Sequence, residues 1–146
     1  MIVGILGGGQ LGMMLCQAAR KLNLQTFIYT DSDDSPAIKY ADSYLIKKYD
    51  NFHEIDSFIK KCDFVTYEFE NIPFKTLSYI EQKINVSPNS QVSKIIQDRL
   101  TEKNYVNNIN IPTVPYIEIY NTTDLKSVDP NFFPAILKTR KLGYDG

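Results

Sequence analysis

The sequence predicts an α/β protein whose first part is built on a parallel β-sheet, and three observations predict it. Short apolar runs rich in branched residues alternate with amphipathic segments over residues 2–90. One apolar run about every 20 residues leaves room for a helical crossover, which parallel strand pairing requires. A glycine-rich loop also joins the first apolar run to the first amphipathic segment, a junction typical of such folds.

The elements are expected in a regular order. Residues 2–6 (IVGIL) form a continuous apolar run, which is typical of a strand buried on both faces. Over 10–22, apolar residues recur at spacings of three and four, which predicts an amphipathic helix. The same patterns predict the elements that follow: strand 25–30, a polar turn at 31–36, strand 44–46, helix 51–61, strand 62–67, helix 73–83 and a short strand at Val86.

The pattern changes in the second part of the chain. A long helix is expected over 90–107, and beyond Pro112 two strands, 116–120 and 135–139, are expected on either side of a short helix. We therefore expect two domains, an α/β domain over 1–95 and the start of a different domain over 96–146.

The composition excludes several classes of function. Of 146 residues, 43% are hydrophobic, and 16 basic residues against 17 acidic ones give a formal net charge of -1. Without a basic excess, binding to a nucleic-acid backbone is not expected. No apolar run approaches the ~20 residues of a membrane span, so no interaction with the membrane is expected. The first residues lack a basic region and a cleavage site, so no signal peptide is expected.

Few side chains suit metal or disulfide chemistry. Cys16 and Cys62 are too few for a disulfide framework and suit a reducing compartment, so we expect a cytoplasmic protein. His53 is the single histidine, and together with two distant cysteines it does not make a zinc site. No metal ligand is assigned in this chain.

The glycine loop is the first candidate site. Residues 7–12 (GGGQLG) satisfy the G-x-G-x-x-G pattern between an expected strand and an expected helix. Glycines permit a tight turn and close approach of a ligand, and the helix N-terminus offers free N–H groups to an anion. Asp31 lies where a dinucleotide fold has its ribose-binding acid. Three hypotheses follow: an NAD(P)-dependent dehydrogenase, a domain for a different phosphorylated ligand, or a tight turn without ligand.

Two acidic residues form the second candidate site. Glu68 and Glu70 follow the expected strand 62–67, and ligands of open parallel sheets lie outside the carboxyl ends of the strands. A carboxylate at this point can accept hydrogen bonds from ribose hydroxyls or from an amine. The alternative is a solvated pair before a helix, where negative charge favours the first turn.

Basic residues form the third candidate site. Arg99 lies in the segment DRLTEK (98–103) of the long helix, where its charge could equally join surface pairs at four-residue spacing. Lys138 ends an expected strand and precedes a glycine-containing loop, 139–146, that suits a clamp on nucleotide phosphates. The alternative is a charged β-turn. The loop is not a Walker A loop, because G-x-x-x-x-G-K-[ST] does not occur.

Four motifs together carry a family resemblance: GGGQLG (7–12), YEFEN (67–71), DRLTEK (98–103) and KTRxxGYDG (138–146). With these motifs in this order and spacing, the chain resembles the amino-terminal part of the 5-(carboxyamino)imidazole ribonucleotide synthases. This family consists of ATP-grasp carboxylases of purine biosynthesis. GGGQLG alone is shared with dinucleotide-binding Rossmann folds and with the ATP-grasp glycinamide ribonucleotide transformylase, and the other motifs are more specific. Leu142 departs from the family pattern, which often has a further glycine there.

The resemblance implies a Rossmann-like pre-ATP-grasp domain followed by the start of an ATP-grasp α+β domain. It implies an ATP-dependent carbon–nitrogen ligase, in which ATP phosphorylates bicarbonate to carboxyphosphate and the amine of 5-aminoimidazole ribonucleotide is then carboxylated. It also implies a homodimer, a Mg²⁺ ion whose ligands are expected beyond residue 146, and a fragment that is inactive by itself. A nucleotide-sensing or scaffold domain without catalysis is the non-enzymatic alternative.

The resemblance assigns site residues by matched position. The residues expected at the ribonucleotide are Gly9, Gln10, Leu11 and Glu68. The residues expected at ATP are Arg99, Lys138, Gly143, Tyr144, Asp145 and Gly146. Lys138 is expected to contact a phosphate, and 143–146 are expected to begin a flexible flap. No catalytic residue is assigned, and Asp31 becomes a turn residue.

Overall fold

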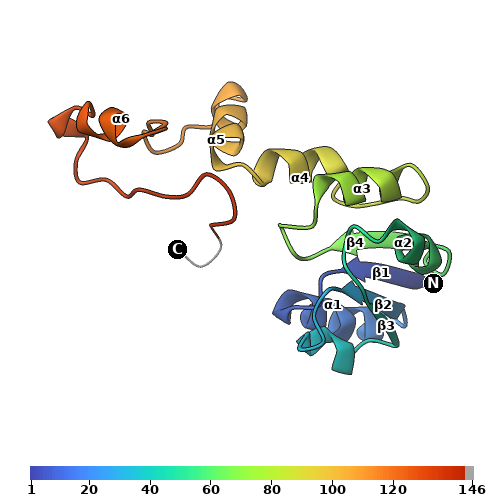
Figure 1. Ribbon diagram of the computed structural model, residues 1–146. Coiled ribbons are helices and arrows are strands. Elements are labelled where there is room, and N and C mark those ends of the chain that lie inside the picture. Colours follow the sequence, from blue (N-terminus) through green and yellow to red (C-terminus); the bar gives the residue numbers. More distant parts are fainter. Residues whose placement is uncertain (144–146) are drawn as a thin grey trace. The chain divides into compact units, whose positions relative to one another are not determined.

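The computed structural model describes residues 1–143 of the chain. Contacts divide the chain into two compact units, Met1–Lys94 and Ile95–Gly146. The first unit contains a β-sheet with helices (Figure 1). The described residues of the second unit form helices and extended segments.

The first unit is built on a four-stranded parallel sheet. Its strands are β1 (Ile2–Leu6), β2 (Gln25–Thr30), β3 (Ser43–Ile46) and β4 (Phe64–Tyr67). They are ordered β3-β2-β1-β4, and each neighbouring pair is parallel. The α/β class and the strands predicted in this part are confirmed, and Val86 adds a single parallel bridge to Val65 of β4.

Helices cover both faces of this sheet (Figure 1). In chain order they are α1 (Gln10–Lys21), the 3₁₀ helix η1 (Pro36–Lys39), α2 (Phe52–Ile59) and α3 (Phe74–Glu81). The next helix, α4 (Ser90–Ile96), contains the boundary between the two units. On one face, Leu6 and Tyr29 belong to the cluster that includes residues of α2 and α3. On the other face, Ile5 and Ile28 pack with residues of α1 and η1. Because successive strand residues point to opposite faces, a strand covered on both sides is apolar throughout.

Gly4 lies in the middle of β1, where the neighbouring side chains leave no room for a larger residue. A Cβ atom at Gly4 would lie 2.7 Å from Sγ of Cys62 and 2.8 Å from Cζ of Phe58. The side chain of Phe58 is fully buried in the cluster beneath α2. The glycine in IVGIL is therefore required by packing between β1 and the end of α2.

We expect Gly4→Ala to lower the free energy of unfolding by about 1–3 kcal/mol, because an added methyl group in a filled core forces its neighbours to shift. Urea unfolding followed by circular dichroism measures the loss. Since Sγ of Cys62 is the nearest atom, the double variant G4A/C62A should lose less than the sum of the two single variants. A G4A chain as stable as the wild type would contradict this packing.

The prediction of one long helix over 90–107 is wrong, because the structure has two helices there. α4 ends at Ile96 and α5 (Arg99–Asn108) begins three residues later. Between them Asp98 has an extended backbone and caps α5, since its carboxylate accepts the N–H groups of Leu100 and Thr101, both at 3.1 Å. An aspartate that caps a helix is more stable outside the helix than within it, so the helical pattern is interrupted here.

The strands predicted at 116–120 and 135–139 are also wrong. Both segments lack strand pairing within residues 1–143. The short helix expected between them is confirmed as α6 (Thr122–Lys126), and η2 (Pro130–Phe132) follows it. Apolar side chains of the extended segments are largely exposed, with Ile136 at 82% and Leu137 at 70%. A strand needs a neighbour for its backbone groups, and no segment in the described part of the chain provides one.

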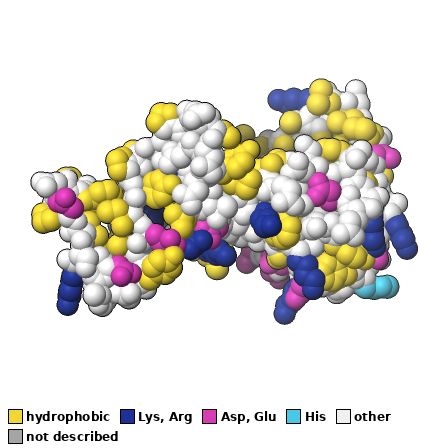
Figure 2. Space-filling model, turned by 90° about the horizontal axis from the view of Figure 1, so that it is seen from above, with side chains coloured by type: hydrophobic (Ala, Val, Ile, Leu, Met, Phe, Trp, Pro, Cys, Tyr) yellow, Lys and Arg dark blue, Asp and Glu magenta, His cyan; other side chains and the backbone are white. Residues whose placement is uncertain are grey.

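The surface carries no concentration of one charge on the face seen in Figure 2. Lys and Arg side chains are spread among acidic and hydrophobic ones there. Between residues 1 and 143, no helix is both long enough and apolar enough to cross a lipid bilayer.

Candidate functional site

The structure brings the residues singled out from the sequence into two groups, one in each unit. The first group is the glycine loop with Glu68, and the second lies around the start of α5. Three further residues expected at ATP, Tyr144, Asp145 and Gly146, lie outside the described residues.

The glycine loop is held tightly to its neighbours. Gly7 has a φ of +104°, a conformation that side chains rarely allow, and its N–H donates to the carbonyl of Tyr29 at 2.9 Å. The carbonyl of Gly8 accepts the N–H of Ala37 at 3.0 Å. A Cβ atom at Gly8 would lie 2.5 Å from Cβ of Ser35. The loop is therefore anchored to β2 and η1 before the chain enters α1.

Glu68 joins this loop from the end of β4. β4 pairs with β1, and the N–H of Glu68 continues that ladder by donating to the carbonyl of Leu6 at 3.1 Å. The Glu68 side chain then turns toward the loop, where Oε1 accepts the N–H of Gly9 at 2.8 Å. Two residues 59 positions apart in sequence are thus brought together at the carboxyl end of the sheet. This is the edge where open parallel sheets bind ligands.

Gln10 and Leu11 form the first turn of α1 beside this contact. Both residues are exposed, and the Leu11 side chain is 56% accessible. Gly9 is the N-cap residue of α1 and provides no side-chain cap, and the first turn of the helix has no acidic residue of its own. The carboxylate of Glu68 is therefore the negative group that balances the N-terminus of α1.

Sequence reasoning missed three polar residues that border the loop. The hydroxyl groups of Thr30 and Ser35 lie 2.7 Å apart, and both residues pack against Gly8. Tyr49 is buried, and burial together with the charges of Asp31 and Glu68 raises the pKa of its hydroxyl. Tyr49 therefore stays protonated near neutral pH. No local pattern marks Tyr49, because its approach to the loop depends on the tertiary fold.

The second group folds a distant segment back onto the start of α5. The N–H of Arg99 donates to the carbonyl of Arg140 at 3.0 Å, and Nε of Arg99 approaches the carbonyl of Thr139 at 3.4 Å. Nε of Arg140 donates to both carboxylate oxygens of Asp98 at 2.8 Å, and its Nη1 donates to Glu118 at 2.6 Å. Asp98 therefore serves both as the cap of α5 and as the anchor of Arg140.

The remaining residues of the expected ATP group lie along the same segment. Lys138 is exposed and stands two residues before Arg140. Gly143 lies close to Arg99, because a Cβ atom at Gly143 would be 2.7 Å from Oγ1 of Thr139 and 3.5 Å from Nη2 of Arg99. Leu142 has a φ of +57°, in the region that favours glycine. The departure of Leu142 from the family pattern thus falls at a position where glycine is the less strained residue.

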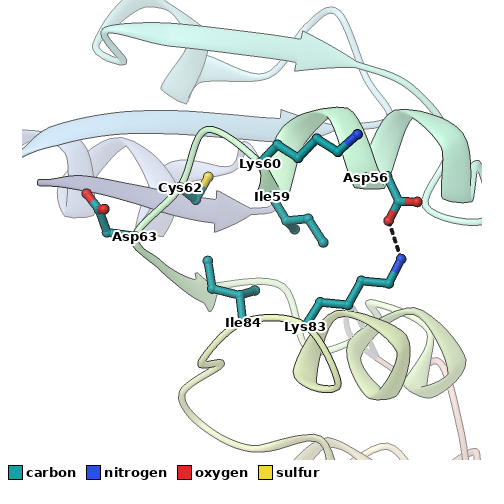
Figure 3. A pocket seen from close by; sticks show the side chains of 7 residues that line it. All are labelled: Asp56, Ile59, Lys60, Cys62, Asp63, Lys83 and Ile84. Atoms are coloured by element: carbon teal, nitrogen blue, oxygen red, sulfur yellow. Dashed lines mark hydrogen bonds and ion pairs between the residues drawn. The ribbon is translucent and has the colours of Figure 1, made fainter.

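A third place, a surface pocket of about 500 Å³, lies at the opposite end of the sheet (Figure 3). Its lining side chains are Asp56, Ile59, Lys60, Cys62, Asp63, Lys83 and Ile84. Asp56 and Lys83 form an ion pair at 2.6 Å, and Asp63 accepts the N–H of Ile2 at 2.7 Å. Burial raises the pKa of the Cys62 thiol to about 12, so this thiol is not a nucleophile at neutral pH.

Metal ligands are not assembled in the described part of the chain. Within residues 1–143, no three His, Cys, Asp or Glu side chains come together in a group that could hold a metal ion. Cys16 and Cys62 are both free thiols.

A parallel sheet with a glycine loop after β1 and an acidic residue after the adjacent β4 defines a Rossmann-like α/β domain. The family model of the ribonucleotide synthetase preATP-grasp domain matches residues 1–97, and the chain belongs to this family. This membership does not favour the dehydrogenase hypothesis.

Curated relatives extend the similarity over nearly the whole chain. The chain is 38% identical over 145 residues to the N5-carboxyaminoimidazole ribonucleotide synthase of Staphylococcus aureus. The aligned region covers 99% of this chain and 39% of the relative. The chain is also 38% identical over 146 residues to the bifunctional purine synthesis protein purC/E of Dictyostelium discoideum, covering 99% of this chain and 14% of that protein. The chain thus spans less than half the length of these relatives.

Solved structures give the same result. The structure of an ADP complex of purK, an N5-carboxyaminoimidazole ribonucleotide synthetase, matches with a TM-score of 0.92 and 34% identity, over 99% of this chain and 39% of that one. The N5-carboxyaminoimidazole synthetase of Staphylococcus aureus matches with a TM-score of 0.85 and 36% identity, over 97% of this chain and 39% of that one. The glycinamide-RNase-transformylase T of Mycobacterium tuberculosis, at 19% identity and a TM-score of 0.75, shares the fold alone.

The ion pair of Asp98 gives the second unit a specific pH dependence. The hydrogen bond from Arg140 lowers the pKa of the Asp98 carboxyl from its ordinary value of 3.8 to about 2. Because the folded-state pKa is the lower one, the stabilising contribution is complete above about pH 4 and is lost as the pH falls toward about 2. We expect the stability difference between wild type and Asp98→Asn to shrink over this range, since asparagine keeps the cap without the charge.

Urea unfolding of both chains at a series of pH values measures this difference. A difference that stays constant between about pH 5 and about pH 2 would contradict the role assigned to the charge of Asp98. Protonation of other carboxylates affects both chains alike, so the comparison isolates this one group.

Proposed function

We propose that the whole protein carrying this chain is an ATP-dependent carbon–nitrogen ligase of purine biosynthesis. It carboxylates 5-aminoimidazole ribonucleotide with bicarbonate to give 5-(carboxyamino)imidazole ribonucleotide. The observation that carries this proposal is the similarity of the entire chain, in sequence and in structure, to N5-carboxyaminoimidazole ribonucleotide synthases. The four motifs that define the two site groups lie within this similarity.

The chemistry proceeds in two steps. Bicarbonate oxygen attacks the γ-phosphorus of ATP, ADP leaves, and carboxyphosphate forms. The exocyclic amine nitrogen of the ribonucleotide then attacks the carboxyl carbon, the carbon–oxygen bond to phosphate breaks, and inorganic phosphate leaves as the amine loses a proton. Carboxyphosphate is hydrolysed readily, so the reacting groups must be held together and water kept out.

The glycine loop group is proposed to hold the ribonucleotide. Gly9, Gln10 and Leu11 stand at the start of α1, and Glu68 lies against them. An ionised carboxylate is an acceptor only, so Glu68 suits the hydroxyl groups or the amine of the ribonucleotide. The residues lie outside the carboxyl ends of β1 and β4, which supports a substrate site there.

The group around the start of α5 is proposed to hold ATP. Arg99 and Lys138 are the cations assigned to the nucleotide, with Gly143, Tyr144, Asp145 and Gly146 as the beginning of the phosphate flap. The similar purK structure is an ADP complex, which supports nucleotide binding by the whole protein. Accordingly, residues 1–95 are proposed as the pre-ATP-grasp domain and 96–146 as the start of the ATP-grasp domain.

Further properties are part of the same proposal. Mg²⁺ is proposed to accompany ATP, and within residues 1–143 no group of three His, Cys, Asp or Glu side chains could hold it. The protein is proposed to be a cytoplasmic homodimer, in keeping with its free thiols. Partners are small molecules rather than nucleic acids or membranes, in keeping with the net charge of -1. The 146-residue chain by itself is proposed to be inactive.

We expect the whole protein to hydrolyse ATP only when both 5-aminoimidazole ribonucleotide and bicarbonate are present. Phosphate release measured with each component omitted in turn tests this dependence. ATP turnover that is indifferent to the ribonucleotide would contradict the proposed reaction. Binding of NAD(P) that is lost in Asp31→Ala would instead support the dehydrogenase.

We expect Glu68→Ala to raise the KM for the ribonucleotide by about 10- to 100-fold, which corresponds to the loss of one or two hydrogen bonds to a charged group. The KM for ATP should change by less than about threefold, since Glu68 is assigned to the other substrate. Glu70→Ala is the matched control, as it removes the same group two residues away. Equal increases in both KM values would show that Glu68 is not a ribonucleotide ligand.

A further inference from the structure

The three glycines of the G-x-G-x-x-G motif all border one side chain of the protein itself. A Cβ atom at Gly7 would lie 2.5 Å from Oε1 of Glu68, and one at Gly9 would lie 3.1 Å from the same oxygen. A Cβ atom at Gly12 would lie 3.4 Å from Cγ of Glu68. In dinucleotide folds the first glycine permits the tight turn, the second lets the backbone approach the pyrophosphate, and the third allows close packing of helix and strand. Here the space beside Gly7 and Gly9 is filled by the Glu68 side chain, and Gly12 also lies against the carbonyl oxygen of Gly7.

The Glu68 carboxylate also lies at the start of α1, which is the positive end of the helix dipole. The N–H of Gly9, at the start of α1, donates to Oε1 of Glu68 at 2.8 Å. No acidic residue in the first turn of α1 and no capping side chain shares this position. A phosphate at the N–H of Gly9 would have to lie beside the Glu68 carboxylate or displace it. Two anions this close repel each other strongly, because the surrounding protein screens them less than water does.

We propose that Glu68 determines the specificity of the glycine loop by closing it to phosphate groups. The carboxylate turns an anion-binding helix start into a site for hydrogen-bond donors, such as sugar hydroxyls and amines. The loop therefore rejects pyrophosphate-bearing cofactors although its sequence matches their motif. Applied to the ribonucleotide, which rests on the proposed function, the phosphate end lies away from Gly9 and the hydroxyl groups or the amine face Glu68.

The charge of Glu68 can be removed without changing its shape. Glu68→Gln keeps an oxygen that can accept the N–H of Gly9 and leaves the side-chain volume nearly unchanged. Glu68→Ala removes both the charge and the side chain, and so opens the space between Gly7 and Gly12 as well. Glu70→Gln is the matched control, because it removes one negative charge from the exposed neighbouring acid.

The experiment titrates the four ¹⁵N-labelled chains, wild type and the three variants, with inorganic pyrophosphate and with NAD⁺. The amide resonances of Gly9 and Gln10 report binding at the loop itself, so binding elsewhere is not counted. We expect these resonances to stay unmoved in wild type and E70Q. From the shifts of these two resonances, we expect E68Q to bind pyrophosphate at least about tenfold more tightly than wild type. E68A should bind pyrophosphate at least as tightly as E68Q.

Four results would overturn the proposal. The first is a wild-type loop that binds pyrophosphate as tightly as E68Q. The second is a loop that stays unresponsive in both E68Q and E68A, which would show that charge is not what closes it. The third is an equal gain in E70Q. Loss of the folded state in both Glu68 variants, seen as collapse of the spectrum, would assign the carboxylate a structural role and contradict the proposal as well.

The outcome is independent of the reaction catalysed by the whole protein. Ribonucleotide-dependent ATP turnover tests the proposed function, and pyrophosphate binding at Gly9 tests the closure of the loop. A closed loop in a protein without carboxylase activity would reject only the proposed function. An open loop in an active carboxylase would reject only the closure.

Discussion

The hydrogen bond from Gly9 to the carboxylate of Glu68 is the contact on which the first unit's site depends. It exists because β4 pairs with β1, which places the residue after β4 beside the loop after β1. The sheet order therefore decides the chemistry of the loop. On our proposal, the start of α1 would accept an anion without Glu68, and with Glu68 it accepts hydroxyl and amine donors.

Asp98 has a related part in the second unit. Its carboxylate accepts two N–H groups at the start of α5 and also pairs with Arg140, 42 residues away in sequence. In both units, then, a carboxylate at a helix start joins segments that are distant in the chain. In the second unit, Arg99 and the residues around Arg140 therefore lie together, although no helical pattern in the sequence links these two segments.

The sequence predicted the parts of the fold that one segment specifies by itself. Apolar runs such as 2–6 and 25–30 were sufficient for the strands, and the glycine loop marked the start of α1. The break at Asp98 was missed because capping competes with an otherwise helical pattern. The segments 116–120 and 135–139 have strand-like composition, but strand formation depends on a partner. The contact of Glu68 with Gly9 and the burial of Tyr49 depend on the tertiary fold, which a linear motif does not contain.

A crystal structure of the whole protein with 5-aminoimidazole ribonucleotide bound tests the central claim most directly. The account predicts a hydroxyl oxygen or the amine nitrogen of the ribonucleotide within about 3 Å of the Glu68 carboxylate, with the phosphate away from the N–H groups at the start of α1. A phosphate bound on the N–H groups of Gly9, Gln10 or Leu11, with Glu68 displaced from the loop, would contradict it.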